Sequence, residues 1–191
     1  MPNLYILADC NGAGKTTVAY TLLPEVVNCV EFVNADEIAR GLSPFNVESM
    51  AIEAGRIMIQ RIDFLMNKGV DFSLETTLST RSYVQTIKRA QALGYRVTMV
   101  YSCLNSVELA KERVRSRVAN GGHAIPDEVI ERRYGRSLQN LLRLYMPVCD
   151  RWIVVDNSLT ELRLIAEGSR LDYVIVNFDL WAWLNTYETD H

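Results

Sequence analysis

Continuous apolar runs alternate along the chain with longer stretches in which apolar residues recur every three or four positions. A short apolar run is typical of a buried parallel strand, and a spacing of three and four is typical of an amphipathic helix. Strands are therefore predicted over residues 4–8, 30–35, 70–77, 96–101 and 151–156. Helices are predicted over residues 18–23, 47–68, 81–93, 107–118 and 126–146, and segment 37–46 is expected to be a loop.

This alternation of strands and helices predicts an α/β fold with a parallel five-stranded sheet and helices on both of its faces. Residues 162–167 and 172–177 flank a turn at Gly168 and are expected to form a C-terminal hairpin, followed by a short helix over 180–184. No repeat, low-complexity tract or linker interrupts the pattern. We therefore expect a single domain that spans residues 1–191.

Composition narrows the function classes. The chain has 191 residues, of which 49% are apolar, so it is long enough to bury a core without disulfides. Its net charge of −3 and the lack of a basic patch along the sequence argue against general nucleic-acid binding. Four widely spaced cysteines and two histidines disfavour a zinc site or a Cys–His pair, and favour reduced thiols. Without a signal peptide or an apolar run of about 18 residues, a cytoplasmic protein with no membrane partner is expected.

The segment after the first strand carries the strongest chemical signal, and it reads Asp9-Cys10-Asn11-Gly12-Ala13-Gly14-Lys15-Thr16-Thr17. Small residues let backbone N–H groups approach phosphate oxygens, and the start of the next helix adds a positive dipole end. Residues 10–17 are therefore predicted to bind ATP, with GTP as the alternative nucleotide. Lys15 is expected to reach the β- and γ-phosphates, and the Thr16 hydroxyl to hold Mg²⁺. Asp9 replaces the first glycine of the usual loop pattern, which places a carboxylate near the phosphates.

Two acidic residues end predicted strands at the same edge of the sheet. The carboxyl ends of parallel strands face the ligand crevice in open α/β sheets, so Asp36 and Glu75 should lie beside the phosphate loop. Asp36 is a candidate general base for a hydroxyl acceptor; in the alternative, the segment Asn34-Ala35-Asp36-Glu37 only caps the following turn. Glu75, together with Thr76, could hold a metal-bound water, accept a hydrogen bond from the substrate, or serve the fold alone. The sequence does not choose among these roles.

Five arginines flank the pair Gly121-Gly122: Arg113 and Arg117 before it, and Arg132, Arg133 and Arg136 after it. Two helices that carry arginines and meet at a Gly-Gly turn are typical of a lid that closes over a triphosphate. Closure brings cations to oxygens that gain charge and excludes water. We therefore expect a lid over about residues 111–137, in which one or two arginines act in catalysis and the others are solvated or paired with nearby glutamates.

Several segments together resemble the zeta-toxin-like P-loop kinases, and most closely a compact bacterial branch of that family. They are the loop at 11–17, Asn34-Ala35-Asp36-Glu37-Ile38-Ala39, Leu74-Glu75-Thr76-Thr77-Leu78-Ser79, the segment from Arg117 through Gly121-Gly122-His123 to Pro126, and Asp156-Asn157-Ser158. The resemblance covers roughly residues 4–158.

The resemblance implies a P-loop NTPase fold like that of nucleoside kinases, and transfer of the γ-phosphate of ATP to a hydroxyl of a small molecule. In the zeta toxins proper this acceptor is the 3′-hydroxyl of the amino sugar in UDP-N-acetylglucosamine. The family roles fall on Lys15 for phosphate, Asp36 as the base, Arg117 with Arg132 or Arg133 for the transferring group, and Glu75 and Thr76 for the acceptor. The chain is shorter than those toxins, so a smaller amino-sugar pocket is expected. Toxicity and an antitoxin partner do not follow from the motifs.

Two other functions fit the same residues. A switch-type NTPase would hydrolyse nucleotide slowly and act on a protein partner. A nucleotide-binding module would result if Asp9 weakened the loop.

Overall fold

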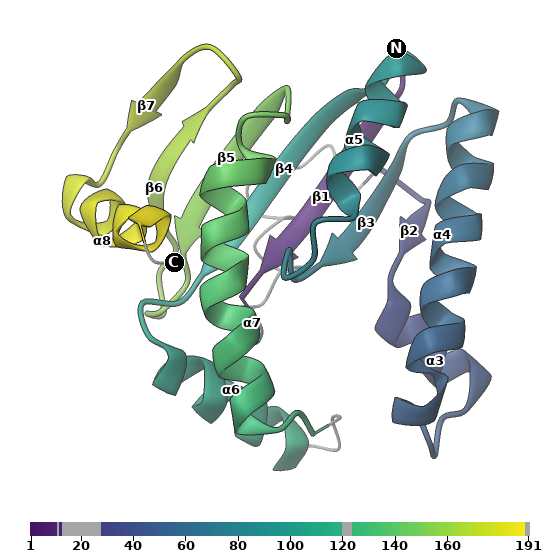
Figure 1. Ribbon diagram of the computed structural model, residues 1–191, viewed down its shortest axis with the longest axis horizontal. Helices are drawn as coiled ribbons and strands as arrows, with labels where there is room; N and C mark the ends of the chain where they lie inside the picture. Colours follow the sequence, from purple (N-terminus) through teal and green to yellow (C-terminus); the bar gives the residue numbers. More distant parts are fainter. Residues whose placement is uncertain (11, 13–27, 120–123, 190–191) are drawn as a thin grey trace.

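The computed structural model describes residues 1–10, 12, 28–119 and 124–189. Its centre is one seven-stranded sheet with the strand order β2-β3-β1-β4-β5-β6-β7 (Figure 1). The strands are β1 (Asn3–Asp9), β2 (Phe32–Val33), β3 (Phe72–Thr76), β4 (Arg96–Cys103), β5 (Arg151–Asp156), β6 (Arg163–Gly168) and β7 (Tyr173–Ile175). The first five are parallel, and β6 and β7 are antiparallel. The predicted parallel strands and hairpin are confirmed, and the hairpin adds two strands to the same sheet.

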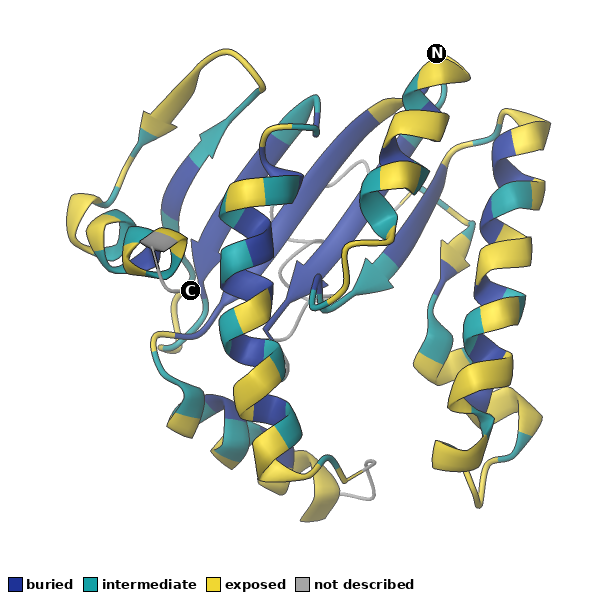
Figure 2. Ribbon diagram, viewed as in Figure 1, coloured by how far each residue is buried: buried dark blue, intermediate teal, exposed yellow. Residues whose placement is uncertain are grey.

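The described helices that cover the sheet lie over one of its faces, in front of it in Figure 1. They are α4 (Ala51–Lys68), α5 (Tyr83–Ala92), α7 (Asp127–Asn140), which continues as a π-helical turn η2 (Leu141–Tyr145), and α8 (Phe178–Thr189). Their buried residues join those of the strands in one large apolar cluster. In Figure 2 the central strands are mostly buried, whereas the sides of these helices that face the viewer carry many exposed residues. The other face of the sheet carries a second, smaller cluster. The helix predicted over 18–23 lies outside the described residues.

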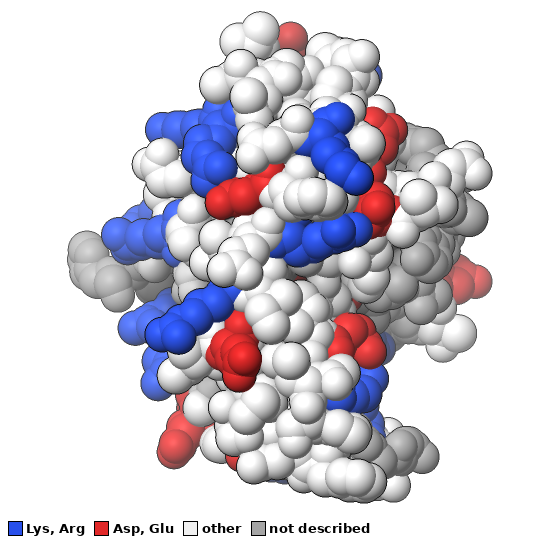
Figure 3. Space-filling view, turned by 90° about the vertical axis from the view of Figure 1, so that its right-hand side faces the viewer, with Lys and Arg blue, Asp and Glu red and all other residues white. Residues whose placement is uncertain are grey.

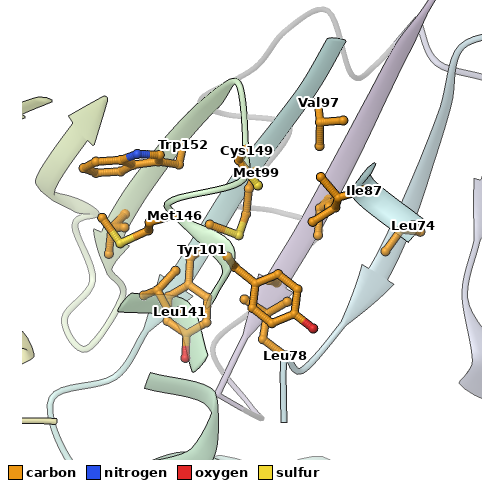
Figure 4. Packing of buried hydrophobic residues seen from close by; sticks show 14 of the residues in the cluster. Leu74, Leu78, Ile87, Val97, Met99, Tyr101, Leu141, Met146, Cys149 and Trp152 are labelled. Atoms are coloured by element: carbon orange, nitrogen blue, oxygen red, sulfur yellow. The ribbon is translucent and has the colours of Figure 1, made fainter. Parts of the chain in front are cut away.

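The larger cluster explains why the helices are amphipathic. Strand residues such as Met99 and Tyr101 point toward this cluster, and Leu141 and Met146 meet them from the helical side (Figure 4). Ile87 of α5 packs into the same cluster and is fully buried. Burial of this kind stabilises the fold by roughly 1.5–3 kcal/mol for each large apolar side chain.

Segment 37–46 was expected to be a loop, and this prediction is wrong at its first half. Residues Ala35–Leu42 form helix α3. The Asn34 side chain caps it, since its Oδ1 accepts hydrogen bonds from the backbone N–H groups of Asp36 (2.8 Å) and Glu37 (3.3 Å). Acidic side chains in the first turn and Arg40 in the last turn favour the helix dipole. The helix was not predicted because glycine, here Gly41, is more common in loops than inside helices.

Other helix ends follow from local chemistry. The helix predicted over 47–68 begins as a 3₁₀ turn η1 (Glu48–Met50) and ends, as predicted, at Gly69. Gly69 has φ +66°, the left-handed conformation that terminates helices and that glycine adopts without strain. Helix α6 (Val107–Ala119) lies with α3 beyond the carboxyl ends of the strands, at the bottom of Figure 1. None of the helices within the described ranges has the length and hydropathy needed to cross a membrane.

Candidate active site

The predicted phosphate loop follows the carboxyl end of β1, the strand that lies between β3 and β4. Ala8 of β1 is paired with Thr76 of β3, so the chain enters the loop directly beside the end of β3. Asn11 and residues 13–27, among them Ala13, Gly14, Lys15, Thr16 and Thr17, lie outside the described residues. Their predicted roles therefore remain predictions.

The backbone of the predicted phosphate loop is described at Gly12. It has φ +78°, which L side chains rarely adopt. A Cβ at this position would lie 3.4 Å from both the carbonyl oxygen of Ala110 and the Cβ of Arg113. Glycine therefore allows a left-handed turn and a close approach to α6, as the predicted phosphate loop requires. Cys10, two residues earlier, is fully buried.

Asp9 does not take the left-handed conformation that glycine favours. It is the last residue of β1, only 2% exposed, and it lies in register with Ser102 of β4. Its place in an extended strand explains why the first glycine of the usual pattern is dispensable for the backbone here. The preceding residue, Ala8, belongs to the larger apolar cluster. Successive side chains of a strand alternate between the two faces, so the Asp9 side chain points to the face that carries the smaller cluster.

A cleft of about 700 Å³ lies between α4 and α5, and we call it the α4–α5 cleft. One wall is apolar and comes mainly from α4. The other wall is rich in hydroxyl groups and comes from the end of β3, the turn after it and the start of α5. The lining residues are Ala35, Ala51, Ile52, Gly55, Arg56, Met58, Ile59, Ile62, Asp63, Glu75, Thr76, Thr77, Ser79, Thr80, Ser82, Tyr83, Gln85, Thr86, Arg89 and Arg133.

The sequence had singled out three of these lining residues, Glu75, Thr76 and Arg133. Glu75 pairs with Leu7, which belongs to the smaller cluster, whereas Thr76 pairs with Ala8 of the larger one. The two residues therefore leave β3 on opposite faces, with Thr76 on the face that carries α4 and α5. The three roles predicted for Glu75 and the acceptor role predicted for Thr76 remain predictions.

Asp36 does not line the α4–α5 cleft. It is exposed in the first turn of α3, next to Ala35, which does line the cleft. The cap by Asn34 fixes the backbone at Asp36 through the 2.8 Å hydrogen bond. Capping was predicted as the alternative role of this segment, and Asn34 performs it, so the Asp36 carboxylate is not used as the cap.

The turn after β3, residues 77–80, is strained at Leu78. This residue is fully buried and has φ +52°, although it is not glycine. Such a conformation costs about 1–3 kcal/mol and persists only where surrounding contacts enforce it. The turn begins with a local hydrogen bond from the Leu78 N–H to the Thr76 hydroxyl, 3.1 Å. We call residues 77–80 the acceptor turn, because three of them line the cleft.

The predicted lid arginines separate into different environments. Arg133 borders the α4–α5 cleft, whereas Arg117, Arg132 and Arg136 are exposed and do not line it. Arg113 donates a hydrogen bond to the carbonyl oxygen of Ser158, 3.3 Å away, beside its contact with the loop at Gly12. The predicted turn at Gly121-Gly122 lies outside the described residues.

Ion pairs join the two helices of the predicted lid. Lys111 of α6 pairs with Glu131 of α7, and Arg115 of α6 pairs with Asp127 of α7. Arg115 and Asp127 are exposed, so solvent screens their attraction, whereas the Lys111 side chain is only 15% exposed. The two ion pairs account for some of the charged residues that the sequence offered as surface partners.

The cysteines match the reduced thiols expected from the sequence. All four are free, and Cys10, Cys103 and Cys149 are buried. Burial raises the pKa of Cys149 to about 12 and raises that of Cys103 well above its ordinary value. These two thiols stay protonated and are poor nucleophiles. Over the described part of the chain, no cluster of three or more His, Cys, Asp or Glu side chains is arranged to hold a metal ion.

The sequence missed some residues of the site. Arg56 and Gly55 line the cleft from α4, and the acceptor turn supplies Ser79 and Thr80. Two signals could have indicated them. One is the glycine inside an otherwise strong helix, and the other is the run of hydroxyl residues between β3 and α5.

A family model for zeta toxins matches residues 1–163. The chain belongs to the zeta toxin family. The family and the fold together identify the chain as a P-loop phosphotransferase. The predicted resemblance and fold class are thereby confirmed.

This member of the zeta toxin family is similar to a bacterial protein and to two solved structures. A protein of Haemophilus influenzae, described as uncharacterized, is 34% identical over 124 residues, which are 65% of this chain and 86% of that protein. A crystal structure of AvrRxo1-ORF1:AvrRxo1-ORF2 with ATP has a TM-score of 0.81 at 16% identity and covers 100% of this chain. This chain spans 65% of that one. A structure of the PezAT toxin–antitoxin system of Streptococcus pneumoniae has a TM-score of 0.71 at 16% identity, with coverages of 100% and 80%. The two structures share the fold.

Proposed function

We propose that the protein is an ATP- and Mg²⁺-dependent kinase that transfers the γ-phosphate to a hydroxyl group of a small molecule held in the α4–α5 cleft. The observation that carries the proposal is the meeting of two features at one sheet edge. The predicted phosphate loop follows β1 beside Thr76, and Thr76 lines the cleft together with Arg133.

The nucleotide is assigned to the phosphate loop, residues 10–17. The left-handed Gly12 and its close approach to α6 fit a loop that wraps a polyphosphate. Lys15 would bind the β- and γ-phosphates, and the Thr16 hydroxyl would hold Mg²⁺, with Glu75 as the further metal candidate. When bound, Mg²⁺ would offset charge on the phosphates. The ATP complex of the structurally similar AvrRxo1-ORF1:AvrRxo1-ORF2 supports this choice of nucleotide.

The transfer step requires positioning and charge neutralisation more than covalent help from the protein. The acceptor oxygen forms a bond to the γ-phosphorus while the bond to the β–γ bridging oxygen breaks, and ADP leaves. Asp36 takes the proton of the acceptor hydroxyl. Arg133 offsets charge on the transferring group from the cleft side, with Arg117 and Arg132 joining it if the predicted lid over 111–137 closes.

The shape of the cleft favours an elongated acceptor. Its α4 wall runs from Ala51 to Asp63, a length of about 18 Å at the helical rise per residue. Its volume of about 700 Å³ lies within the range of small-molecule sites. These dimensions suit a nucleotide sugar such as UDP-N-acetylglucosamine better than a single monosaccharide.

The proposal is tested with γ-labelled ATP, Mg²⁺ and a panel of nucleotide sugars, nucleosides and sugar acids. Label should reach one acceptor class in the wild type, and Asp36→Asn should abolish this transfer. Glu37→Gln is the matched control, because it removes a carboxylate from the same helical turn that is already paired with Arg40 at 2.8 Å. Label that reaches only water would refute the kinase and favour a switch-type NTPase. Heat of ATP binding that is absent in the wild type but present in Asp9→Gly would favour a nucleotide-binding module weakened at Asp9.

A further inference from the structure

The acceptor turn, residues 77–80, is held in place by helix α7 and the π-helical turn that follows it. Three polar side chains of this segment each donate a hydrogen bond to a different backbone carbonyl of the turn. These are Ser137 Oγ to Thr77 O (2.5 Å), Asn140 Nδ2 to Leu78 O (2.7 Å) and Tyr145 OH to Thr80 O (2.6 Å). The strained Leu78 lies in the middle of these contacts, which explains why its left-handed backbone is stable.

Ser137 also contacts two strands of the sheet, β4 and β1. Its fully buried hydroxyl lies 2.7 Å from the hydroxyl of Tyr101 on β4 and 3.4 Å from the carbonyl oxygen of Asp9 at the end of β1. Burial raises the pKa of Tyr101 well above its ordinary value, so the phenol keeps its proton. Because each hydroxyl has one proton, Tyr101 donates to Ser137, and Ser137 donates to Thr77.

Arg133 lies on the same helix, one turn before Ser137. Residues four apart share one face of an α-helix, so Arg133 and Ser137 project from the same side of α7. Arg133 borders the cleft, and Ser137 touches both the acceptor turn and the strand that leads into the phosphate loop. One rigid helix therefore spans the three parts of the site.

We propose that Ser137 is a positioning residue. Together with Asn140, it fixes the acceptor turn relative to the phosphate loop and Arg133. This inference rests on the proposed function, because it assigns the α4–α5 cleft to the acceptor.

The variant Ser137→Ala tests the proposal, with Tyr134→Phe as the matched control. Tyr134 lies on the same helix, is buried, and donates an equivalent hydrogen bond of 2.6 Å to Leu104, away from the acceptor turn. Ser137→Ala removes the hydrogen bond to Thr77 and the one from Tyr101, and Tyr134→Phe removes the hydrogen bond to Leu104. Both variants lose buried hydrogen bonds of α7, so an effect of lost stability alone would appear in both.

The first readout is the ratio of phosphate transferred to UDP-N-acetylglucosamine to phosphate released to water, with Mg²⁺ and ATP. Ser137→Ala should lower this ratio about tenfold or more, because misplacing a reacting group by about 1 Å costs on the order of a hundredfold. Its affinity for ATP should stay within about twofold of wild type. Tyr134→Phe should leave the ratio unchanged. Equal ratios in the two variants would overturn the proposal.

The second readout is hydrogen–deuterium exchange of the acceptor turn, which needs no acceptor. Ser137→Ala should speed exchange in residues 77–82 well below the melting temperature, and Tyr134→Phe should not. If the wild type transfers no phosphate to the nucleotide sugar, the proposed acceptor is wrong and the exchange decides alone. Unchanged exchange in Ser137→Ala would refute the positioning role.

Discussion

Gly55 offers a substitution that separates stability from acceptor binding. It lies in the interior of α4, lines the cleft, and has no described atom within 4 Å of the position that a Cβ would occupy. A glycine inside a helix costs about 0.5–1 kcal/mol relative to alanine. The protein therefore retains a destabilising residue where a side chain would enter the cleft.

Gly55→Ala should raise the free energy of unfolding by about 0.5–1 kcal/mol, which corresponds to roughly 1–4 °C in Tm for a chain of this size. Gly55→Leu should give a similar gain in stability, because leucine is nearly as good a helix former. Its side chain would compete with the acceptor for the same space, at a cost of about 1–3 kcal/mol. This cost predicts a rise of about 5- to 150-fold in the KM for the acceptor, with the affinity for ATP unchanged.

The assay combines thermal unfolding with the KM for UDP-N-acetylglucosamine and calorimetry with ATP. Gly41→Ala is the control, because Gly41 lies in α3, also has open space at its Cβ position, and does not line the cleft. It should stabilise the protein without changing KM. If Gly55→Leu raises Tm but leaves KM at the wild-type value, the acceptor does not bind between α4 and α5.

Three further substitutions test separate parts of the account. Gly12→Ala forces an L side chain into φ +78° against α6, so ATP binding measured by calorimetry should weaken by about 1–2 kcal/mol, and unchanged binding would argue against the loop geometry. Asn34→Ala removes the cap of α3 and should cost about 1 kcal/mol of stability; because the cap holds the backbone at Asp36, kcat should fall while the Kd for ATP does not. Burial raises the pKa of Cys149 from 9.0 to about 12, so the unfolded thiol ionises first and stability falls as pH rises above about 9. Between about pH 9 and pH 10 this loss should be about 1 kcal/mol larger in the wild type than in Cys149→Ala, measured by urea unfolding, and parallel pH profiles would contradict the assigned burial effect.

The periodicity of apolar residues was sufficient to predict the sheet, because each buried strand needs an apolar run and each covering helix needs one apolar stripe. The C-terminal hairpin was predicted for the same reason, although not its place in the central sheet, since strand order depends on contacts between distant segments. Helix α3 was missed because Gly41 resembles a loop residue, while the capping signal of Asn34 lies in a single side chain.

The candidate site was predictable where chemistry depends on a local motif and unpredictable where it depends on packing. Thr76 and Arg133 do line one cleft, although 57 positions separate them in the chain. Ser137 and Asn140 are polar residues on the buried side of α7, and in the sequence they resemble ordinary solvent-facing positions. The left-handed Leu78 has no sequence signal, because its conformation is imposed by the carbonyl contacts around it.

Charges of both signs are mixed on the side of the molecule that carries α4. Figure 3 shows basic and acidic side chains interspersed on the side of the molecule formed by the right-hand elements of Figure 1. Two ion pairs involving α4 are Arg61 with Glu31 at 2.5 Å and Arg89 with Asp63 at 2.9 Å. A nucleic-acid-binding surface would carry a continuous basic patch instead. Arg89 and Asp63 line the cleft, so their pairing makes that part of its wall neutral in charge.

The most direct test of the account is a crystal structure with a non-hydrolysable ATP analogue, Mg²⁺ and UDP-N-acetylglucosamine. The account predicts that the γ-phosphate lies at the mouth of the α4–α5 cleft, near Lys15 and Arg133. It also predicts an acceptor hydroxyl about 3–3.5 Å from the γ-phosphorus and within hydrogen-bond reach of Asp36. A nucleotide bound away from the phosphate loop, or an acceptor bound outside the cleft, would contradict it.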